Sequence, residues 1–452
     1  MTFAQYALDI THDSQRQSWV ASANGTHAQG NDFPLQNLPL GIFSVGAGSV
    51  HVQPRAGVAI GDQILDLNSA VAAGLFTGAA VDAIYATADG NLNALMEQGH
   101  ATSDALRLAV STLLGAEPSP TSLAARTIAS QILVPQADVR MHLPTRIGGF
   151  TDFMTSIDHV RRARSKLHPN DAVPVTLLHM PLAYNSRASS VRVSGHEVTR
   201  PNGQSRLADG SVTFGPCSAL DFELELGAFV GPGNELGDVI ALDDAPRHLF
   251  GYCLLNDWSA RDIQRWESLP LGPFLGKSFC TVVSPWVVTA QALAPYACAP
   301  SPRNAGLPAP LAYLRSARND SSGAIDLQLQ AWISSQAMRE RNLAPVRITD
   351  SRFVDMHWTF AQMLTHHASN GCDLQPGDLI GSGTVSGSQL TSCGCLAELS
   401  GPLTLPDGTE RIWLADGDEL IFKASARREG FASIGFGECR SRVLAARPWP
   451  GH

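Results

Sequence analysis

Leu220-Asp221-Phe222-Glu223-Leu224-Glu225-Leu226 alternates strictly between apolar and acidic side chains. Because successive side chains of a β-strand point to opposite faces, this stretch predicts a strand with its carboxylates on one face and its apolar side chains on the other. Neighbouring carboxylates repel one another, and Ca²⁺ or Mg²⁺, which prefer carboxylate oxygens, would remove that repulsion. The alternative is an antiparallel strand with one solvated face.

A second polar segment follows the next predicted strand, in Asn256-Asp257-Trp258-Ser259-Ala260-Arg261-Asp262-Ile263-Gln264 and its continuation over 270–278. It has no amphipathic period. A strand end that delivers an aspartate and then turns to present fixed donors can hold a hard cation and clamp an anionic, oxygen-rich substrate beside it. A surface turn with salt bridges is the alternative. The side chains concerned are Asp257, Arg261, Gln264 and Lys277.

A further acid lies upstream, in Gly149-Phe150-Thr151-Asp152-Phe153, and His159 follows it by seven residues. A short helix or turn between the two would return both side chains to one pocket. A lone histidine after an apolar segment is nevertheless more often a surface or core residue than a catalytic base. The complete set of carboxylates would be Asp152, Glu223, Glu225 and Asp257.

The pattern of the remaining chain indicates a mostly β protein with two domains. Short apolar strands alternate with glycine and aspartate turns from about residue 34, which predicts a small β-barrel. Helical periodicity over 81–97 and 103–114 follows, and a proline-rich break then places a linker within 115–140. A later helix over 357–369 should end at Gly371, because glycine can adopt a left-handed cap. Further strands are expected at 191–193, 219–229, 250–256, 286–289, 325–333 and 419–424.

These blocks together resemble the fumarylacetoacetase (fumarylacetoacetate hydrolase) family over nearly the whole chain. Besides the stretches quoted above, those that carry the resemblance are Leu38 to Ser44, Gly57 to Asp62, Tyr184-Asn185-Ser186-Arg187-Ala188-Ser189-Ser190, Gly272 to Ser278 and Gly381-Ser382-Gly383-Thr384-Val385-Ser386-Gly387. The resemblance implies an amino-terminal SH3-like β-barrel and a larger mixed β-roll domain that pairs with its copy as a homodimer. The corresponding limits are an extension over 1–33, the SH3-like domain with its linker over 34–140 and the catalytic β-roll over 141–452.

The activity that the resemblance implies is metal-dependent hydrolysis of a carbon–carbon bond in a 1,3-diketo acid. Fumarylacetoacetate would be converted into fumarate and acetoacetate, in tyrosine and phenylalanine catabolism. The metal ligands implied by position are Asp152, Glu223, Glu225 and Asp257, with Lys277 and Thr281 beside the Ca²⁺ or Mg²⁺ ion. The catalytic residues implied are His159 as general base, Glu398 as the group that orients it, Lys277, Arg261 and Gln264. The substrate would contact Arg261, Gln264, Tyr184, Thr384, Met154 and Ser268.

The chemistry independently requires groups of these kinds. Cleaving a carbon–carbon bond with water needs an activated nucleophile and a place for negative charge to collect on the departing enolate. A cation on the diketone oxygens supplies the second requirement. A histidine whose other ring nitrogen is held by a carboxylate is a suitable base for the first. Lys277 and Arg261 would stabilise the charge that develops after attack.

Several positions depart from the family pattern. Met154 and Ser268 stand where the family has tyrosines, so two phenolic contacts to substrate would be absent. The family's substrate-gripping arginine has no clear equivalent, and Arg164 and Lys166 are the candidates. Because specificity depends on pocket contacts, these changes favour, as an alternative, a related hydrolase or decarboxylase acting on another acylpyruvate or 1,3-diketo acid. A non-catalytic scaffold is disfavoured, since clustered like charges destabilise an empty site.

Bulk composition fits a folded enzyme with a small-molecule substrate. The chain has 452 residues, of which 44% are hydrophobic. Its 32 basic and 41 acidic side chains leave a net charge of −9 without long runs of either sign, which argues against nucleic acid or an acidic membrane surface as a partner. Eight cysteines without zinc-type spacing favour reduced thiols in the cytoplasm. We expect no signal peptide and no membrane span.

Overall fold

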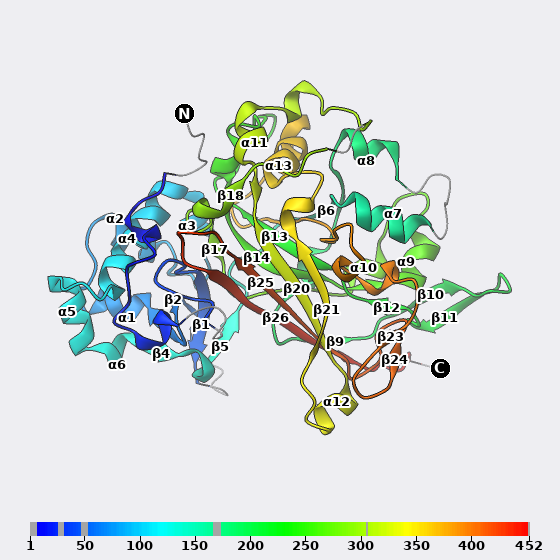
Figure 1. Cartoon of the computed structure of the whole chain (residues 1–452), viewed down its shortest axis with the longest axis horizontal. Helices are drawn as coiled ribbons and strands as arrows, with labels where there is room; N and C mark the ends of the chain where they lie inside the picture. Colours follow the sequence, from blue (N-terminus) through cyan, green and yellow to red (C-terminus); the bar gives the residue numbers. More distant parts are fainter. Residues whose placement is uncertain (1–6, 26–30, 47–52, 166–172, 304–305, 451–452) are drawn as a thin grey trace.

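The protein is a mixed, strand-rich molecule with a small amino-terminal unit and a larger unit, as the computed structural model shows (Figure 1). The structure describes residues 7–25, 31–46, 53–165, 173–303 and 306–450. The strand-rich character predicted from the sequence is confirmed. Among the residues that the structure describes, none of the helices combines the length and the apolar character needed to span a bilayer.

The amino-terminal unit is an antiparallel sheet of five strands in the order β4-β3-β2-β1-β5, with helices packed beside it. Its strands are β1 (Leu40–Val45), β2 (Arg55–Ile60), β3 (Gln63–Asp66), β4 (Leu133–Pro135) and β5 (Val139–His142). Its helices are α1 (Leu67–Ala72), α2 (Ala79–Tyr85), α3 (Asn93–Glu97), α4 (His100–Leu114), α5 (Pro120–Thr127) and α6 (Ala129–Ile132).

Two local expectations for this unit differ from the structure. The helix expected over 81–97 is divided into α2 and α3 by a turn that contains Gly90, whose φ of 68° favours glycine. The segment expected as a linker, 115–140, contains α5, α6 and β4, and β4 pairs with β3. The proline-rich break is a helix start, because Ser119 caps α5 and Pro120 occupies its first turn, where proline is tolerated.

The larger unit contains an eight-stranded and a five-stranded sheet. Its strands are β6 (Phe150–Met154), β7 (Leu182–Asn185), β8 (Val191–Val193), β9 (Glu197–Thr199), β10 (Asn202–Arg206), β11 (Val212–Pro216), β12 (Leu220–Asp221), β13 (Leu224–Val230), β14 (Leu249–Asp257), β15 (Ser259–Ala260), β16 (Thr281–Val283), β17 (Val288–Thr289), β18 (Ala297–Cys298), β19 (Ala324–Ile325), β20 (Leu327–Ser334), β21 (Val346–Arg352), β22 (Leu379–Gly381), β23 (Leu403–Thr404), β24 (Glu410–Arg411), β25 (Glu419–Ala426) and β26 (Ile434–Leu444). Its α-helices are α7 (Ile157–Ser165), α8 (Val175–His179), α9 (Arg261–Glu267), α10 (Leu275–Ser278), α11 (Ala317–Ser322), α12 (Gln336–Glu340) and α13 (Phe360–His367).

The eight-stranded sheet has the order β7-β6-β22-β13-β14-β16-β8, with β17 also paired to β14. One of its faces packs on the five-stranded sheet β21-β20-β25-β26-β9, and the two faces form one apolar core. Phe222 meets Phe422 of β25 edge-on, with ring centroids 5.7 Å apart. The apolar side chains Leu224 and Leu226 point into this core, as the alternation of their strand predicts.

The opposite face of this sheet packs partly on the amino-terminal unit. Phe150, Phe229, Leu255 and Val283 share an apolar core with residues of β1 and α4. The contact continues in the backbone, because Leu40 and Val287 exchange hydrogen bonds of 3.0 and 2.8 Å. The amino-terminal unit thus covers one end of the sheet face, and the other end of the same face carries the polar groups described below.

The strand over 220–226 is interrupted, which corrects one expectation. β12 ends at Asp221 and β13 begins at Leu224, so the three acids do not form one regular row. Asp221 turns away and accepts hydrogen bonds from the backbone N–H groups of Leu396 (2.9 Å) and Ala397 (3.1 Å). The helix expected over 357–369 is closer to the structure, because α13 and a short 3₁₀ turn end at Gly371, whose φ is 82°.

Candidate active site

A row of polar side chains crosses the eight-stranded sheet at the end that the amino-terminal unit leaves free. The register explains the row: Tyr184 pairs with Asp152, Asp152 with Gly381, and Asp257 with Thr281. Glu225 lies two residues from Gly227, which pairs with Gly381, so it shares the same face. Strands β7, β6, β13, β14 and β16 therefore each deliver one polar group to a common site, although these residues are far apart in the chain.

Carboxylates gather closely in this row. One oxygen from each of Asp152, Glu223 and Asp257 lies within 4.8 Å of the others, and all three residues are buried. Glu225 has no exposed surface and accepts a hydrogen bond of 3.1 Å from the N–H of Gly383. The structure thus brings together the four carboxylates predicted from the sequence.

Two of these carboxylates lack the partners that a buried charge requires. Within the described part of the chain, Asp152 Oδ1 and Glu225 Oε1 have no hydrogen-bond partner. Burial, with the negative charge of Asp257, raises the pKa of Asp152 well above its ordinary value, and burial, with Asp152, does the same to the pKa of Glu225. Orphaned carboxylate oxygens that face other carboxylates are the donor set that a hard cation satisfies, so the residues fit a divalent metal ion.

The hydroxyl of Tyr184 contacts two carboxylates of the cluster but can donate a hydrogen bond to only one of them. It lies 2.8 Å from Asp152 Oδ2 and 2.7 Å from Asp257 Oδ2, yet a phenol has one proton to donate. One of the two oxygens is therefore left without that donor. Burial, with the charges of Asp152 and Asp257, raises the pKa of Tyr184 well above its ordinary value, so the hydroxyl keeps its proton.

Lys277 supplies a buried cation to the other end of the cluster. Its Nζ donates to Glu223 and, over 2.8 Å, to Asp257 Oδ2, while Thr281 Oγ1 donates to Asp257 Oδ1 over 2.7 Å. Burial alone would lower the pKa of Lys277, but Asp257 and Glu223 outweigh burial and raise it. Lys277 is therefore positively charged. Helix α10 holds it in place with only 4% of its surface exposed.

Arg261 extends the charged network from the start of α9. Its Nε donates to Asp221 (2.9 Å), and its Nη1 lies 2.8 Å from Glu223 and donates to Gln264 Oε1 over 3.2 Å. Burial would raise the pKa of Glu223, but Lys277 and Arg261 outweigh burial and lower it. Nη2 of Arg261 is buried and has no hydrogen-bond partner among the described residues, so a donor remains for a ligand.

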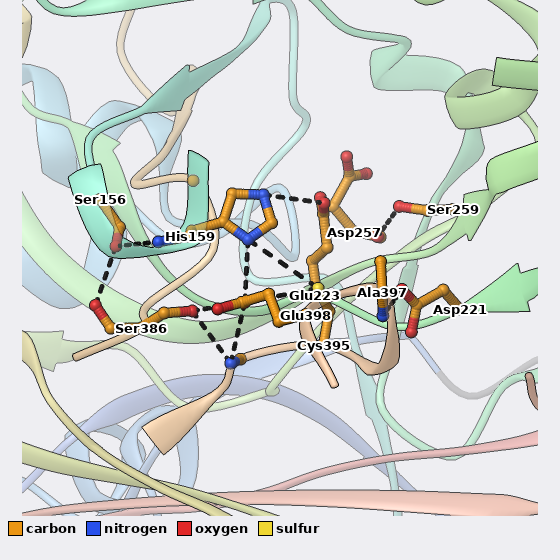
Figure 2. A network of polar contacts seen from close by, with 12 residues as sticks. Ser156, His159, Asp221, Glu223, Asp257, Ser259, Ser386, Cys395, Ala397 and Glu398 are labelled. Atoms are coloured by element: carbon orange, nitrogen blue, oxygen red, sulfur yellow. Dashed lines mark hydrogen bonds and ion pairs between the residues drawn. The ribbon is translucent and has the colours of Figure 1, made fainter. Parts of the chain in front are cut away.

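His159 lies beside the carboxylate cluster on α7 and is paired with Glu398 (Figure 2). Its Nδ1 is 2.9 Å from Glu398 Oε1, and its Nε2 is 3.9 Å from Glu223 Oε1. Burial would raise the pKa of Glu398, but His159 and the hydrogen bonds of Ser386 and Arg162 lower it to about 2. Because an ionised carboxylate only accepts, Nδ1 carries a proton toward Glu398, and Nε2 is the ring nitrogen that faces the cluster.

The sequence did not indicate the groups that hold Glu398. Ser386 Oγ donates to Glu398 Oε1 over 2.7 Å, the N–H of Gly394 does so over 3.2 Å, and Cys395 Sγ lies 3.4 Å away. Arg162 Nη1 donates to the other oxygen, Oε2, over 3.0 Å. A spacing of three residues between His159 and Arg162 on a helix was the only available signal, because positions three apart lie on one helix face.

The remaining predicted positions differ in how they relate to this centre. Thr384 is buried and directly follows Gly383, whose N–H contacts Glu225. Ser268 ends α9 and donates to the carbonyl oxygen of Gln264. Met154 packs against the apolar cluster of Val160, Leu177 and Trp358 rather than against a carboxylate. The side chain of Arg164 and the whole of Lys166 lie outside the described residues.

The strand-rich fold brings a buried carboxylate cluster, a paired lysine and a carboxylate-held histidine into one site, which is an arrangement suited to a hydrolytic enzyme. Two family models match the chain: "Fumarylacetoacetase N-terminal" over residues 36–144 and "Fumarylacetoacetate (FAA) hydrolase C-terminal" over residues 149–444. The chain belongs to the fumarylacetoacetate hydrolase family.

Proteins named fumarylacetoacetase from several organisms are similar to this chain over almost their whole length. The protein of Oryza sativa subsp. japonica is 41% identical over 440 residues, which cover 96% of this chain and 99% of the relative. The proteins of Bos taurus (43% identical) and Homo sapiens (42% identical) each align with 93% of this chain and 98% of their own length. With the two family models, the similarity extends over both units of the chain.

Proposed function

We propose that the protein hydrolyses the carbon–carbon bond of fumarylacetoacetate and releases fumarate and acetoacetate. The observation that carries the proposal is the position of His159, whose Nδ1 is held 2.9 Å from Glu398 while Nε2 points at the carboxylate cluster. The name and the near-complete alignment of the relatives support the same activity. The enzyme would act in tyrosine and phenylalanine catabolism.

The proposed metal ligands are Asp152, Glu223, Glu225 and Asp257, with Lys277 and Thr281 beside the ion. The orphaned oxygens of Asp152 and Glu225 support this assignment. An oxygen-only donor set suits Ca²⁺ and Mg²⁺ rather than a thiophilic metal. When bound, such an ion polarises the oxygens of a 1,3-diketone and offsets the negative charge that collects there.

The catalytic roles follow from where the protons lie. His159 Nε2 takes a proton from water, and the imidazolium so formed is stabilised by Glu398 through Nδ1–H. Lys277 Nζ and the unpartnered Nη2 of Arg261 stabilise the oxyanion produced by attack. Gln264 fixes the guanidinium by accepting from Nη1. The departing enolate then recovers a proton from the imidazolium.

The substrate pocket would be lined by Tyr184, Thr384, Met154 and Ser268, beside Arg261 and Gln264. Met154 and Ser268 stand where the resemblance implies tyrosines, so two phenolic contacts to substrate would be absent. The alternative substrate, another acylpyruvate or 1,3-diketo acid, is less favoured, because relatives that bear one name align along the whole chain.

The finer architecture belongs to the same proposal. The sheet of β1 to β5 would be an SH3-like barrel over 34–140, preceded by an extension over 1–33, and 141–452 would be a β-roll of the fumarylacetoacetase type. Two copies would form a homodimer in the cytoplasm, without nucleic acid as a partner. Chromatography with light scattering tests the dimer, and a mass of 48.1 kDa in solution, that of one chain, would contradict it.

The function is tested by following the loss of diketone absorbance with fumarylacetoacetate as substrate, with and without a chelator. The expected result is fast loss that the chelator abolishes and that added Ca²⁺ or Mg²⁺ restores. If absorbance is unchanged while metal is bound, fumarylacetoacetate is not the substrate, and the assay is repeated with acylpyruvates. Turnover that persists in metal-free protein would contradict the metal-dependent mechanism.

A further inference from the structure

Arg162 joins three separate groups behind the histidine that faces the carboxylate cluster. Its Nη1 donates to Glu398 Oε2 over 3.0 Å. Its Nη2 donates to the carbonyl oxygens of Gly387 (2.7 Å) and Gln389 (3.2 Å). Arg162 therefore ties the helix that bears His159 both to Glu398 and to the loop that carries Ser386.

Glu398 is the group on which these contacts converge. Its side chain has no exposed surface, and it accepts at Oε1 from His159, Ser386 and Gly394 (Figure 2). All of these partners at Oε1 are neutral whenever the imidazole is neutral. The ion pair at Oε2 is with Arg162, whose side chain is 17% exposed.

A general base must be neutral before it accepts a proton, and this requirement creates a charge problem. A buried carboxylate beside a neutral imidazole is costly, because an uncompensated charge loses its hydration. A guanidinium is always protonated, so Arg162 offsets the charge of Glu398 in every state of His159.

We propose that Arg162 is a positioning residue of this active site: it holds Glu398 oriented against His159 Nδ1, so that Nε2 stays directed at the carboxylate cluster. The inference rests on the proposed function. It accounts for the choice of arginine at this position, because the forked guanidinium places Nη1 on the carboxylate and Nη2 on the two carbonyl oxygens.

A purely structural role is the alternative, since Arg162 also fastens α7 to the loop over 387–389. The two roles make different predictions. A fastening residue changes stability and the folded fraction, whereas a residue that positions Glu398 changes kcat of the folded enzyme. Substrate does not contact Arg162 in the positioning role, so KM should change little.

The test compares Arg162→Gln, Arg162→Lys and a matched control, Arg161→Gln. Arg161 is the neighbouring residue on α7, is half exposed and pairs with Asp158 over 2.8 Å, so its variant removes the same charge without affecting Glu398. We expect R162Q to lower kcat about 10- to 100-fold, a range usual for partners that orient an active-site histidine, at nearly constant KM. R162K should recover part of the loss, and R161Q should behave as wild type.

A double-mutant cycle with Glu398→Gln tests whether Arg162 acts through that carboxylate. If it does, R162Q adds less than about twofold to the loss in E398Q, because coupled residues are not additive. Equal losses in both backgrounds would overturn the proposal. So would a kcat of R162Q, corrected for the folded fraction, that equals that of R161Q.

A readout without substrate separates this inference from the proposed function. In ¹H NMR, the Nδ1–H of His159 that is hydrogen-bonded to Glu398 should give a downfield resonance that is absent from His159→Ala. We expect the resonance to shift or broaden in R162Q and to stay unchanged in R161Q. If wild type turns over no fumarylacetoacetate, the proposed function fails while this arm still decides the role of Arg162; an unchanged resonance in R162Q would overturn it.

Discussion

Gly381 of β22 lies directly beside Asp152 of β6, and its lack of a side chain makes room for the carboxylate. A methyl group at this position would overlap Asp152 Oδ1 and would lie 3.1 Å from Glu225 Oε2. Both carboxylates project from the strands that flank β22 on either side. The glycine therefore serves the site rather than the backbone, whose φ at this position is not in the left-handed region.

Gly381→Ala should displace Asp152 and Glu225 without unfolding the sheet. We expect the affinity for Ca²⁺ or Mg²⁺, measured by isothermal titration calorimetry, to fall at least about tenfold, since carboxylate geometry determines affinity for these ions. Gly215→Ala is the control, because a Cβ at Gly215 meets no neighbouring atom. Metal affinity that is equal in the two variants would show that the orphaned oxygens do not form the metal site.

Neutralising Glu225 should separate the stability of the metal-free protein from metal binding. Glu225→Gln removes one of the clustered carboxyl groups and supplies an amide N–H₂ beside the orphaned oxygen of Asp152. We expect the metal-free variant to be more stable than wild type by about 1 kcal/mol, as judged from urea unfolding. Added metal should raise the Tm of wild type but not that of the variant.

The exposed Glu235 offers the same charge change without a buried neighbour. Glu235→Gln should therefore leave both the metal-free stability and the metal-induced rise in Tm unchanged. A wild-type response to metal in Glu225→Gln would exclude Glu225 as a ligand.

Replacing His159 tests the proposed base directly. His159→Ala should lower kcat about 10²- to 10⁴-fold, the contribution usual for a general base, with little change in Tm or metal affinity. His196→Ala, at an exposed position, is the control and should retain full activity. Retained turnover in His159→Ala would remove it as the base, whatever the fate of the metal site.

The four carboxylates and the histidine were expected from the alternation over 220–226, from the polar run after Asn256 and from the resemblance to the family. The order of strands could not be predicted, because Asp152 and Gly381 are neighbours through a parallel pairing of segments more than two hundred residues apart. Alternation also misplaced Asp221, since the strand breaks where Asp221 accepts two backbone N–H groups. The partners of Glu398 lie on a loop and on a helix, and the sequence of neither segment has a periodicity that predicts the contact.

In the fold too, features determined by neighbouring residues were expected from the sequence, whereas a strand determined by long-range pairing was not. α4 was expected from its apolar period, and the left-handed Gly371 was expected from its place after a helix. The segment 115–140 was expected to be a linker of the amino-terminal domain, and its strand was missed because β4 has three residues and no readable alternation. Such a strand is specified by its pairing with β3 rather than by its own sequence.

Asp104 of α4 provides a test of electrostatics away from the active site. Burial, opposed by Arg107 and aided by Asp9, raises its pKa to about 6, above the ordinary 3.8. Between these values the folded state binds more protons than the unfolded state, so the stability contribution of Asp104 falls as pH rises from about 4 to about 6. Asp104→Asn should therefore raise the free energy of unfolding at pH 8, by about 1 kcal/mol after allowance for partial exposure, and the gain should vanish near pH 4.

The exposed Asp238→Asn is the control, and urea unfolding at both pH values is the measurement. A gain that is equal at pH 8 and pH 4 would show that packing, rather than charge, determines the effect.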